Sequence, residues 1–345
     1  MNKLNESNII TSYNFARNST IVFNELVTKK QFKKLNLNQE DLELLNYSGG
    51  LDIVSYRLKT FTLSNGDIIF SNSGSIKLLF YYLNKIKKVS ELILITSQSD
   101  LAITEELFMK KPKSIKKWFA VNVDFEHKDL IPIPLGLANN YSPKNLRLED
   151  FNNRNFINKK ISKLYINLET STNRVERTNI YEEFNKYDWV VAKEPNLTFE
   201  NYLDDLKTYK YVLCPWGNGY DTHRIWETLY AGSIPVVKKH HTYRYLKNLP
   251  VIFVNDYKDI DLKFLLSEEK KFDHLNLDKL YMNYWVELIN SELKNNPKIT
   301  EEIVFSKFIN KYFTLSRKFI GKVNSKLKII NYYLRKLSEK IKNQV

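Results

Sequence analysis

The sequence predicts an α/β protein with two domains, each built on a parallel sheet, and a helical C-terminal tail. Two segments, residues 67–100 and 209–237, each have the pattern strand, loop, helix, strand, which is the repeating unit of parallel sheets. The chain has 345 residues, more than one ordinary core holds, so two domains are expected. After residue 262 the apolar spacing is helical to the end of the chain. These observations predict two Rossmann-like domains followed by helices.

Composition narrows the class of protein. Hydrophobic residues make up 43% of the chain, which is too apolar for disorder, and 53 basic against 39 acidic residues give a formal net charge of +14. That charge favours anionic partners: nucleotide sugars, phospholipid surfaces or nucleic acid. A single cysteine excludes an internal disulfide and is typical of a reducing compartment. Without a signal-peptide pattern or an apolar run of spanning length, we expect a cytoplasmic location, peripheral on the inner face of a membrane.

The predicted domains are residues 1–145, residues 160–262 and a helical extension over 263–345, with a polar linker at 142–162. Residues 1–60 contain no recognisable motif, although a strand is expected within 51–63.

In the first domain, polar residues follow the predicted strands. A strand at 67–70, a helix at 76–88 and a strand at 92–95 lead to Asp100. Asp100 lies where a general base could accept a proton from an acceptor hydroxyl; the pattern favours the alternative that Ser99 or Asp100 caps a helix beginning near Ile103. Loops after parallel strands open at the carboxyl edge of the sheet, where ligands bind.

The next strand, expected at 118–123, is followed by an extended, proline-stiffened stretch at 131–137. His127, between them, is a second candidate base, and a solvated loop histidine is the alternative. Asp124 stands between Asn122 and Glu126 rather than in an Asp-x-Asp motif, so we expect no bound metal.

The most informative stretch is residues 209–237. A buried strand at 211–214 ends in a Pro-Trp-Gly-Asn-Gly loop that contains Gly217, Asn218 and Gly219. Asp221 and Thr222 come where the N-cap of the following helix belongs. Gly232 ends that helix, and an Ile-Pro-Val-Val strand at 234–237 follows.

The start of this helix has the chemistry of an anion site. A helix N-terminus favours phosphate, and Arg224 in the first turn adds a fork of donors, with His223 beside it. Glu227 is three residues further along, where its carboxylate could accept from ribose hydroxyls. An ordinary Arg–Glu surface pair is the alternative.

The motif from Cys214 to Val237 resembles the donor site of exostosin-like glycosyltransferases (family 47), and its second half is similar to fucosyltransferases. The resemblance is strong over about thirty residues and weaker over roughly 60–260. It implies a GT-B fold, an inverting, metal-independent transfer of a hexose or pentose from a UDP- or GDP-linked donor, and no separate cofactor. Arg224 and Glu227 would hold the diphosphate and the ribose. The acceptor would be a glycan or lipid-linked hydroxyl, with no nucleic acid bound. The alternative is a non-catalytic protein that binds sugar or polyanions.

The second domain is expected to open with a strand at 164–168 and a loop at 169–177 that carries Arg174 and Arg177. A first strand-to-helix loop with hydroxyls and arginines can clamp phosphate, and we expect Arg174 to serve there ahead of Arg177. A helix is expected over 175–186.

From Phe319 apolar residues recur in steps of three and four, and residues 317–345 carry nine basic residues and one acidic residue, a net +8. A dimer helix, a helix packed on the body and an interfacial membrane helix all fit; the flanking cations favour an anionic membrane surface.

Overall fold

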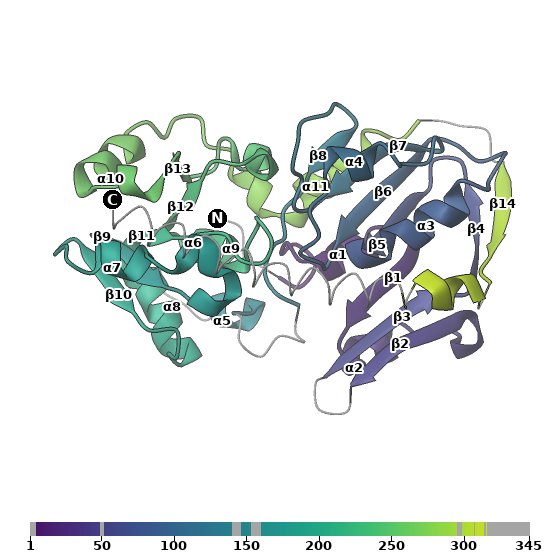
Figure 1. The fold of residues 1–345 in the computed structure, drawn as a ribbon, viewed down its shortest axis with the longest axis horizontal. Helices are drawn as coiled ribbons and strands as arrows, with labels where there is room; N and C mark the ends of the chain where they lie inside the picture. The colour runs from purple at the N-terminus through teal and green to yellow at the C-terminus, as the bar shows by residue number, and fades with distance from the viewer. Residues whose placement is uncertain are drawn as a thin grey trace, which may run out of the picture.

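The computed structural model describes residues 5–48, 52–139, 146–152, 160–294, 299–306, 308–313 and 315. They form two lobes, each centred on a sheet (Figure 1). The described part of the chain is mixed α/β, as the sequence predicts. None of its helices is both long enough and apolar enough to cross a bilayer. The predicted linker and the C-terminal tail from residue 316 lie wholly or partly outside the described residues.

The first lobe contains a seven-stranded sheet in the order β2-β3-β1-β5-β6-β7-β8. Five neighbouring strands, β1 and β5–β8, are parallel, and β3 and β2 add an antiparallel edge. The bounds are β1 Ile21–Val27, β2 Leu42–Ser48, β3 Ile53–Leu58, β5 Ile68–Asn72, β6 Leu92–Ser97, β7 Ile115–Ala120 and β8 Leu130–Pro132. The helices α1 Ser12–Arg17, α2 Lys29–Lys34, α3 Ile76–Leu83 and α4 Glu105–Phe108 connect them.

The second lobe contains a five-stranded parallel sheet in the order β10-β9-β11-β12-β13. The strands are β9 Ile161–Asn167, β10 Val190–Lys193, β11 Tyr209–Leu213, β12 Ile234–Lys238 and β13 Ile252–Val254. Around them lie α5 Leu148–Asn152, α6 Arg174–Arg177, α7 Ile180–Phe184, α8 Phe199–Thr208, α9 His223–Tyr230 and α10 Leu262–Glu269. If these strands are numbered 1 to 5 along the chain, their order in the sheet is 2-1-3-4-5. The direction of winding therefore reverses between β9 and β11, and in such folds a crevice forms outside the carboxyl ends of these two strands.

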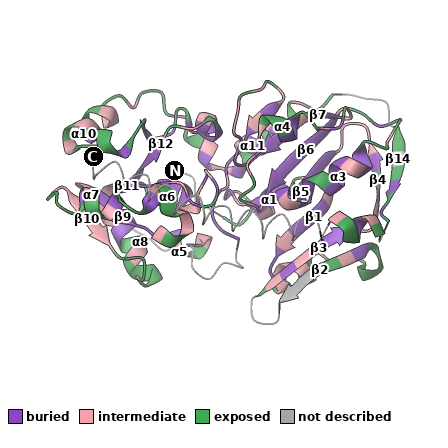
Figure 2. Ribbon diagram, in the orientation of Figure 1, coloured by how far each residue is buried: buried purple, intermediate pink, exposed green. Residues whose placement is uncertain are grey.

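The central strands of both lobes are largely buried because helices cover the sheets, as the purple segments of Figure 2 show for β5, β6 and β11. One apolar cluster joins the lobes: it includes Phe119 and Ile133 of the first lobe together with Trp226 and Trp285. Burial of such large side chains stabilises the pairing of the lobes as well as each lobe by itself.

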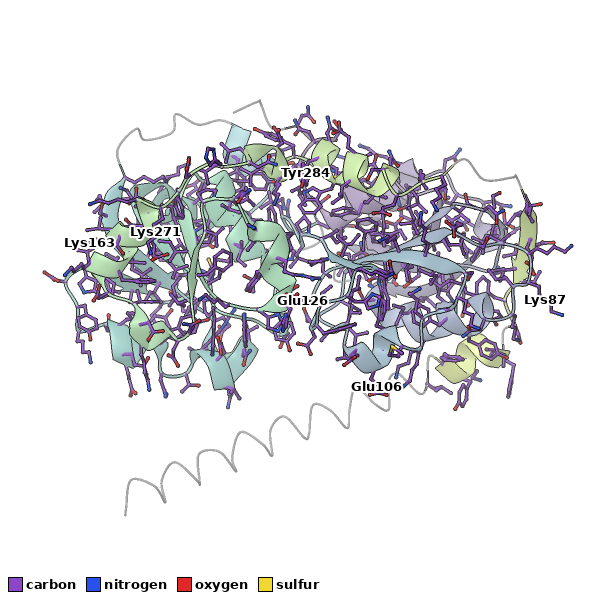
Figure 3. The ribbon with its side chains drawn as sticks, turned by 90° about the horizontal axis from the view of Figure 1, so that it is seen from above. Lys87, Glu106, Glu126, Lys163, Lys271 and Tyr284 are labelled. Atoms are coloured by element: carbon purple, nitrogen blue, oxygen red, sulfur yellow. The ribbon has the colours of Figure 1, made fainter. Side chains whose placement is uncertain are left out.

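The prediction that the chain is helical to its end after residue 262 is wrong. Helices α10 and α11 Met282–Asn290 form as expected, but β14 Thr300–Val304 is a strand paired antiparallel with β4 Thr60–Ser64 of the first lobe. The backbone amide of Lys87, at the outer end of that lobe in Figure 3, donates to Glu301 of β14. The chain therefore returns to the first lobe, because the exposed edge of β4 supplies hydrogen bonds that no local pattern reveals.

Two helix expectations also need correction. The cap expected at Ser99 or Asp100 is supplied by Thr104, whose hydroxyl accepts from the Leu107 amide at the start of α4. The helix expected over 175–186 forms as two short helices, α6 and α7, rather than one.

Candidate functional site

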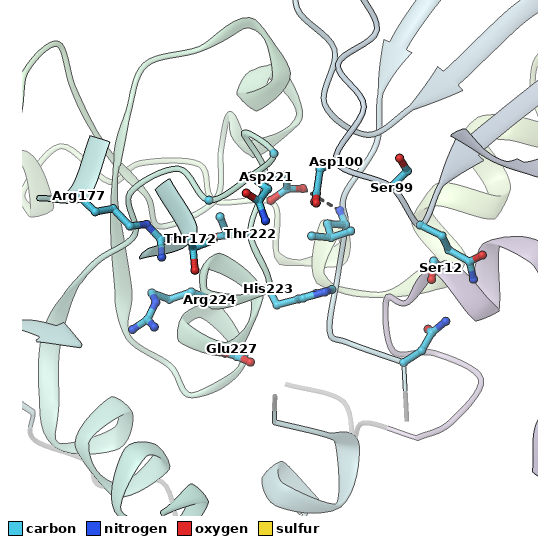
Figure 4. Close-up of a pocket in the computed structure, with 16 residues that line it drawn as sticks. Ser12, Ser99, Asp100, Thr172, Arg177, Asp221, Thr222, His223, Arg224 and Glu227 are labelled. Atoms are coloured by element: carbon cyan, nitrogen blue, oxygen red, sulfur yellow. Dashed lines mark hydrogen bonds between the residues drawn. The ribbon is translucent and has the colours of Figure 1, made fainter. Parts of the chain in front are cut away.

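A cavity of about 390 Å³ lies between the two lobes, at the carboxyl ends of the neighbouring strands β9 and β11. Figure 4 shows Arg177, Thr172 and Arg224 on one side of it and Ser99 and Ser12 on the other. Nine of the residues predicted from the sequence line this cavity: Asp100, Gly217, Asn218, Gly219, Asp221, Thr222, His223, Arg224 and Glu227. The fold thus brings Asp100, from the first lobe, opposite the motif of the second lobe.

The N-terminus of α9 faces this cavity without its usual side-chain cap. Thr222 holds the N-cap position, as predicted, but its hydroxyl makes no capping hydrogen bond. Its Oγ1 is buried and has no hydrogen-bond partner among the described residues, and the same holds for Nη1 of Arg224. Buried polar atoms are normally paired, so an unpaired hydroxyl and guanidinium N–H together indicate room for a ligand with acceptor oxygens.

Arg224 and Glu227 are not an ordinary ion pair. The Arg224 guanidinium lies 5.3 Å from the centre of the Tyr202 ring, a cation–π contact. Glu227 is buried and accepts from the Tyr202 hydroxyl at 2.8 Å and from the Leu146 amide at 3.3 Å. Glu227 therefore holds Tyr202 under Arg224, and each of its oxygens keeps a lone pair for a further donor.

The second arginine of the cavity is Arg177, not Arg174. Arg174, which the sequence favours as the phosphate clamp, is exposed and is not among the residues that line the cavity. Arg177 is buried, and its three nitrogens donate to the carbonyls of Glu169, Pro215 and Trp216. Burial and the charge of Arg224 lower the pKa of Arg177 to about 10, which leaves it cationic at neutral pH. Arg177 joins the loops that follow β9 and β11 and adds positive charge beside Arg224.

His127, the second candidate base, is not brought to the cavity. Its ring packs on Phe108 and its Nδ1 accepts from the amide of Asp129, all within the first lobe. His127 is thus the loop histidine of the alternative interpretation. His223 does line the cavity, where its Nδ1 lies 2.8 Å from the carbonyl oxygen of Gly136. That carbonyl can only accept, so Nδ1 carries the proton.

Asp221 makes hydrogen bonds at the contact between the lobes. Its Oδ2 accepts from the Leu135 amide of the first lobe at 2.8 Å and from the Tyr245 hydroxyl at 2.5 Å. Burial raises the pKa of Asp221 to about 6, although these hydrogen bonds oppose the rise. Asp221 thus contacts the first lobe through Oδ2 and stands one residue before the N-cap position, which Thr222 holds.

Asn122 braces the glycine loop from the first lobe. Its side-chain oxygen accepts from the amide of Asp221 at 2.9 Å, and its amide nitrogen donates to the carbonyl of Ser99. A Cβ on Gly219 would come within 2.7 Å of that side chain, so any larger residue there would require the Asn122 side chain or the loop to shift.

A second set of contacts between the lobes lies beside the glycine loop. His240 stacks on Tyr220 and lies 3.1 Å from Asp124. Glu126, where the two lobes meet in Figure 3, lies 3.5 Å from His241 and 3.7 Å from Arg244. Asp124 is therefore part of this contact, and the described residues contain no group of three His, Cys, Asp or Glu side chains placed to hold a metal ion.

Sequence reasoning missed several cavity residues: Ser12, Gln98, Ser99, Leu135, Asn139 and Thr172. Thr172 lies in the loop at 169–177, which the sequence predicts to bind phosphate through its hydroxyls and arginines, so Thr172 could have been predicted with it. The first-lobe residues come from four separate segments, and nothing local in the sequence connects them.

The second lobe is an open parallel sheet, and the cavity lies at its switch point, which is where ligands bind in α/β proteins of this kind. Residues 152–296, which include this sheet and the motif, match the RXYLT1 C-terminal domain, a domain of the exostosin-like xylosyltransferase family. This part of the chain is thus similar to that domain, and the predicted resemblance to exostosin-like glycosyltransferases is confirmed over these residues. The match supports a glycosyltransferase in general. No curated protein matches the chain.

Proposed function

We propose that this protein is a glycosyltransferase of GT-B arrangement that transfers a sugar, with inversion and without a metal ion, from a UDP- or GDP-linked donor to a hydroxyl of a glycan or lipid-linked acceptor. The observation that carries the proposal is a pair of buried donors, Arg224 Nη1 and Thr222 Oγ1, at the N-terminus of α9, which have no hydrogen-bond partner among the residues that the structure describes. Two phosphate groups would satisfy both donors, since a diphosphate presents several acceptor oxygens.

In the proposed reaction the acceptor oxygen forms a bond to the anomeric carbon as the bond from that carbon to the diphosphate breaks. The leaving diphosphate gains negative charge, which Arg224, Arg177 and the helix N-terminus stabilise. Asp100, on the opposite side of the cavity, accepts the proton of the acceptor hydroxyl. Glu227 accepts a hydrogen bond from a ribose hydroxyl with its remaining lone pairs.

The test compares Arg224→Ala with Arg174→Ala, a matched control that loses the same side chain outside the cavity. UDP or GDP at a hundredfold excess over Kd should stabilise the wild type and Arg174→Ala by about 2.7 kcal/mol. This stabilisation is measured as a rise in the melting temperature. Arg224→Ala should lose this shift and about 2–4 kcal/mol of transition-state stabilisation in kcat/KM for the donor.

If Arg224→Ala binds the nucleotide and turns over as the wild type does, the proposed donor site is wrong. An oligonucleotide that stabilises the protein as much as UDP or GDP would instead favour the polyanion-binding alternative. Glu227→Gln separates the ribose contact, because it should weaken nucleotide binding while the fold persists.

A further inference from the structure

The first-lobe wall of the cavity contains a buried hydrogen-bond donor that the donor site does not use. Asn139 lines the cavity and is only 5% exposed. Its Oδ1 accepts from the backbone amide of Tyr13 at 3.3 Å, which fixes the orientation of the side-chain amide. Its Nδ2 is buried and has no hydrogen-bond partner among the described residues. Because buried polar atoms are normally paired, Nδ2 is a donor available to a ligand in the cavity.

His223 supplies the complementary group, a hydrogen-bond acceptor. Figure 4 shows its ring reaching from α9 toward the first lobe, and the residue lines the same cavity as Asn139. The ring donates from Nδ1 to the carbonyl oxygen of Gly136 at 2.8 Å. In the neutral ring this leaves the lone pair on Nε2, which can accept a hydrogen bond from a ligand.

One short segment of the first lobe, residues 135–139, positions both groups. Gly136 has a φ of +72°, and a Cβ there would lie 2.1 Å from the backbone oxygen of Ile10, so a side chain would clash with the backbone. The amide of Leu137 also donates to that oxygen at 2.9 Å. The same segment therefore aims the carbonyl that holds His223 and, three residues later, carries Asn139. A donor and an acceptor held in this way are preorganised for a ligand.

The pairing of a donor with an acceptor selects the chemistry of the ligand. A hydroxyl group both accepts and donates, so neighbouring hydroxyls of a sugar can satisfy Asn139 and His223 together. An ionised phosphate or carboxylate has no proton for Nε2, and it would be repelled by the carboxylate of Asp100. Asp100 is the only charged side chain among the described first-lobe residues that line the cavity: Ser12, Gln98, Ser99, Asp100, Leu135 and Asn139.

We propose that Asn139 and His223 form an acceptor subsite that recognises two hydroxyls of a neutral sugar. Nδ2 of Asn139 donates to one hydroxyl and Nε2 of His223 accepts from the other, while the reacting hydroxyl faces Asp100. The proposal rests on the proposed function and narrows its acceptor to an uncharged sugar residue. The diphosphate of the donor stays at the opposite wall, where the arginines lie.

The experiment is saturation-transfer NMR on the full chain in the presence of UDP or GDP. The probes are the methyl glycosides of glucose, galactose, mannose and xylose, and the 6-phosphates of the first three sugars. The wild type should bind at least one neutral glycoside, and more tightly than the 6-phosphate of a probe sugar. Asn139→Asp keeps an acceptor for Tyr13 but removes the N–H from the cavity. His223→Asn keeps a donor for Gly136 but removes Nε2. Each should weaken binding of that glycoside about tenfold, because one hydrogen bond is lost.

The matched control is Asn179→Asp, which makes the same change of charge at an exposed position outside the cavity. It should bind the glycoside as the wild type does. The rise in melting temperature with UDP or GDP, measured on every variant, should persist in Asn139→Asp and shows that the fold and the donor site are intact.

The outcomes separate the subsite from the proposed function. A wild type that binds the glycoside but is stabilised by neither nucleotide would contradict the proposed function and leave the subsite standing. Tighter binding of the phosphorylated sugars, or binding of none of the probes, would overturn the subsite. So would equal affinities for the glycoside in the wild type, Asn139→Asp and His223→Asn.

Discussion

Arg224 illustrates how far a single residue can be understood from its neighbours. Its place in the first turn of a helix after a glycine loop predicts a contact with an anion. An ion pair with Glu227 would compete with that contact, and the structure shows why no such pair forms. Glu227 is occupied by Tyr202 and Leu146, so the guanidinium keeps an unpaired N–H toward the cavity. The cation is thus held by a ring beneath it rather than neutralised by a carboxylate.

Asp221 leads to a prediction about pH. Its pKa is raised from 3.8 to about 6, so its contribution to stability is fully present below about pH 4 and is lost as pH rises through 6. The free energy of unfolding of the wild type should therefore fall by roughly 3 kcal/mol relative to Asp221→Asn over that range. An amide oxygen can still accept from Leu135 and Tyr245, which keeps the variant folded.

Urea unfolding of both ligand-free proteins at several values between pH 4 and pH 7 measures this difference. Other titrating groups are common to the two proteins and cancel in the comparison. Parallel curves would show that Asp221 keeps an ordinary pKa in the folded protein.

At the scale of elements, the loop between β11 and α9 owes its shape to both lobes. Arg177 and Asn173 bind its carbonyls from the second lobe, at Pro215, Trp216 and Gly217. Asn122 meets it from the first lobe. A loop held from two sides is preorganised for a ligand, which lowers the entropy lost on binding.

Gly219→Ala tests this packing. The added methyl group would come within 2.7 Å of the Asn122 amide, so we expect a loss of about 1–3 kcal/mol in stability. Gly217→Ala is the control, because its nearest neighbour would lie at an ordinary 3.4 Å. Removing the obstructing side chain with Asn122→Gly, which suits the positive φ of that residue, should make the second substitution almost neutral.

Denaturant midpoints of the four proteins of this cycle give the coupling energy between the two positions. Additive losses would mean that the loop relaxes away from Asn122 without cost, and that the first lobe does not brace it.

The whole molecule places the cavity between two lobes that share one apolar cluster. The second lobe contributes the cations and the helix N-terminus, whereas the first contributes Asp100, Ser99 and Gln98. In the proposed reaction, the positive charge that holds the donor and the polar groups that hold the acceptor would come from opposite walls of the cavity. This division would allow the two substrates to meet without either wall having to hold both.

The same arrangement predicts that turnover is insensitive to chelators, since two arginines and a helix N-terminus would offset the charge of the leaving diphosphate. Donor hydrolysis or transfer should proceed equally before and after treatment with EDTA followed by desalting. Activity that disappears with EDTA and returns with manganese or magnesium would contradict this and direct attention to Asp124.

What the sequence by itself determined is local: the α/β class, the strand–loop–helix–strand motif over 209–237, and the position of Arg224 and Glu227 in the first turns of α9. These follow from periodicity, glycine placement and residue type, which act over a few residues at a time. Such signals also sufficed to place Asp100 on a loop at the carboxyl edge of its sheet.

Only the tertiary structure decided which of two arginines lines the cavity, which candidate base lies across from it, and how Asp221 contacts the first lobe. Each of these depends on a partner distant in the chain: Trp216 for Arg177, Phe108 for His127, Leu135 for Asp221. The return of β14 to the edge of β4 is the same kind of outcome. Hydrogen bonds and burial between distant segments outweigh local preferences of a fraction of a kcal/mol per residue. Such contacts therefore cannot be predicted from neighbouring residues in the sequence.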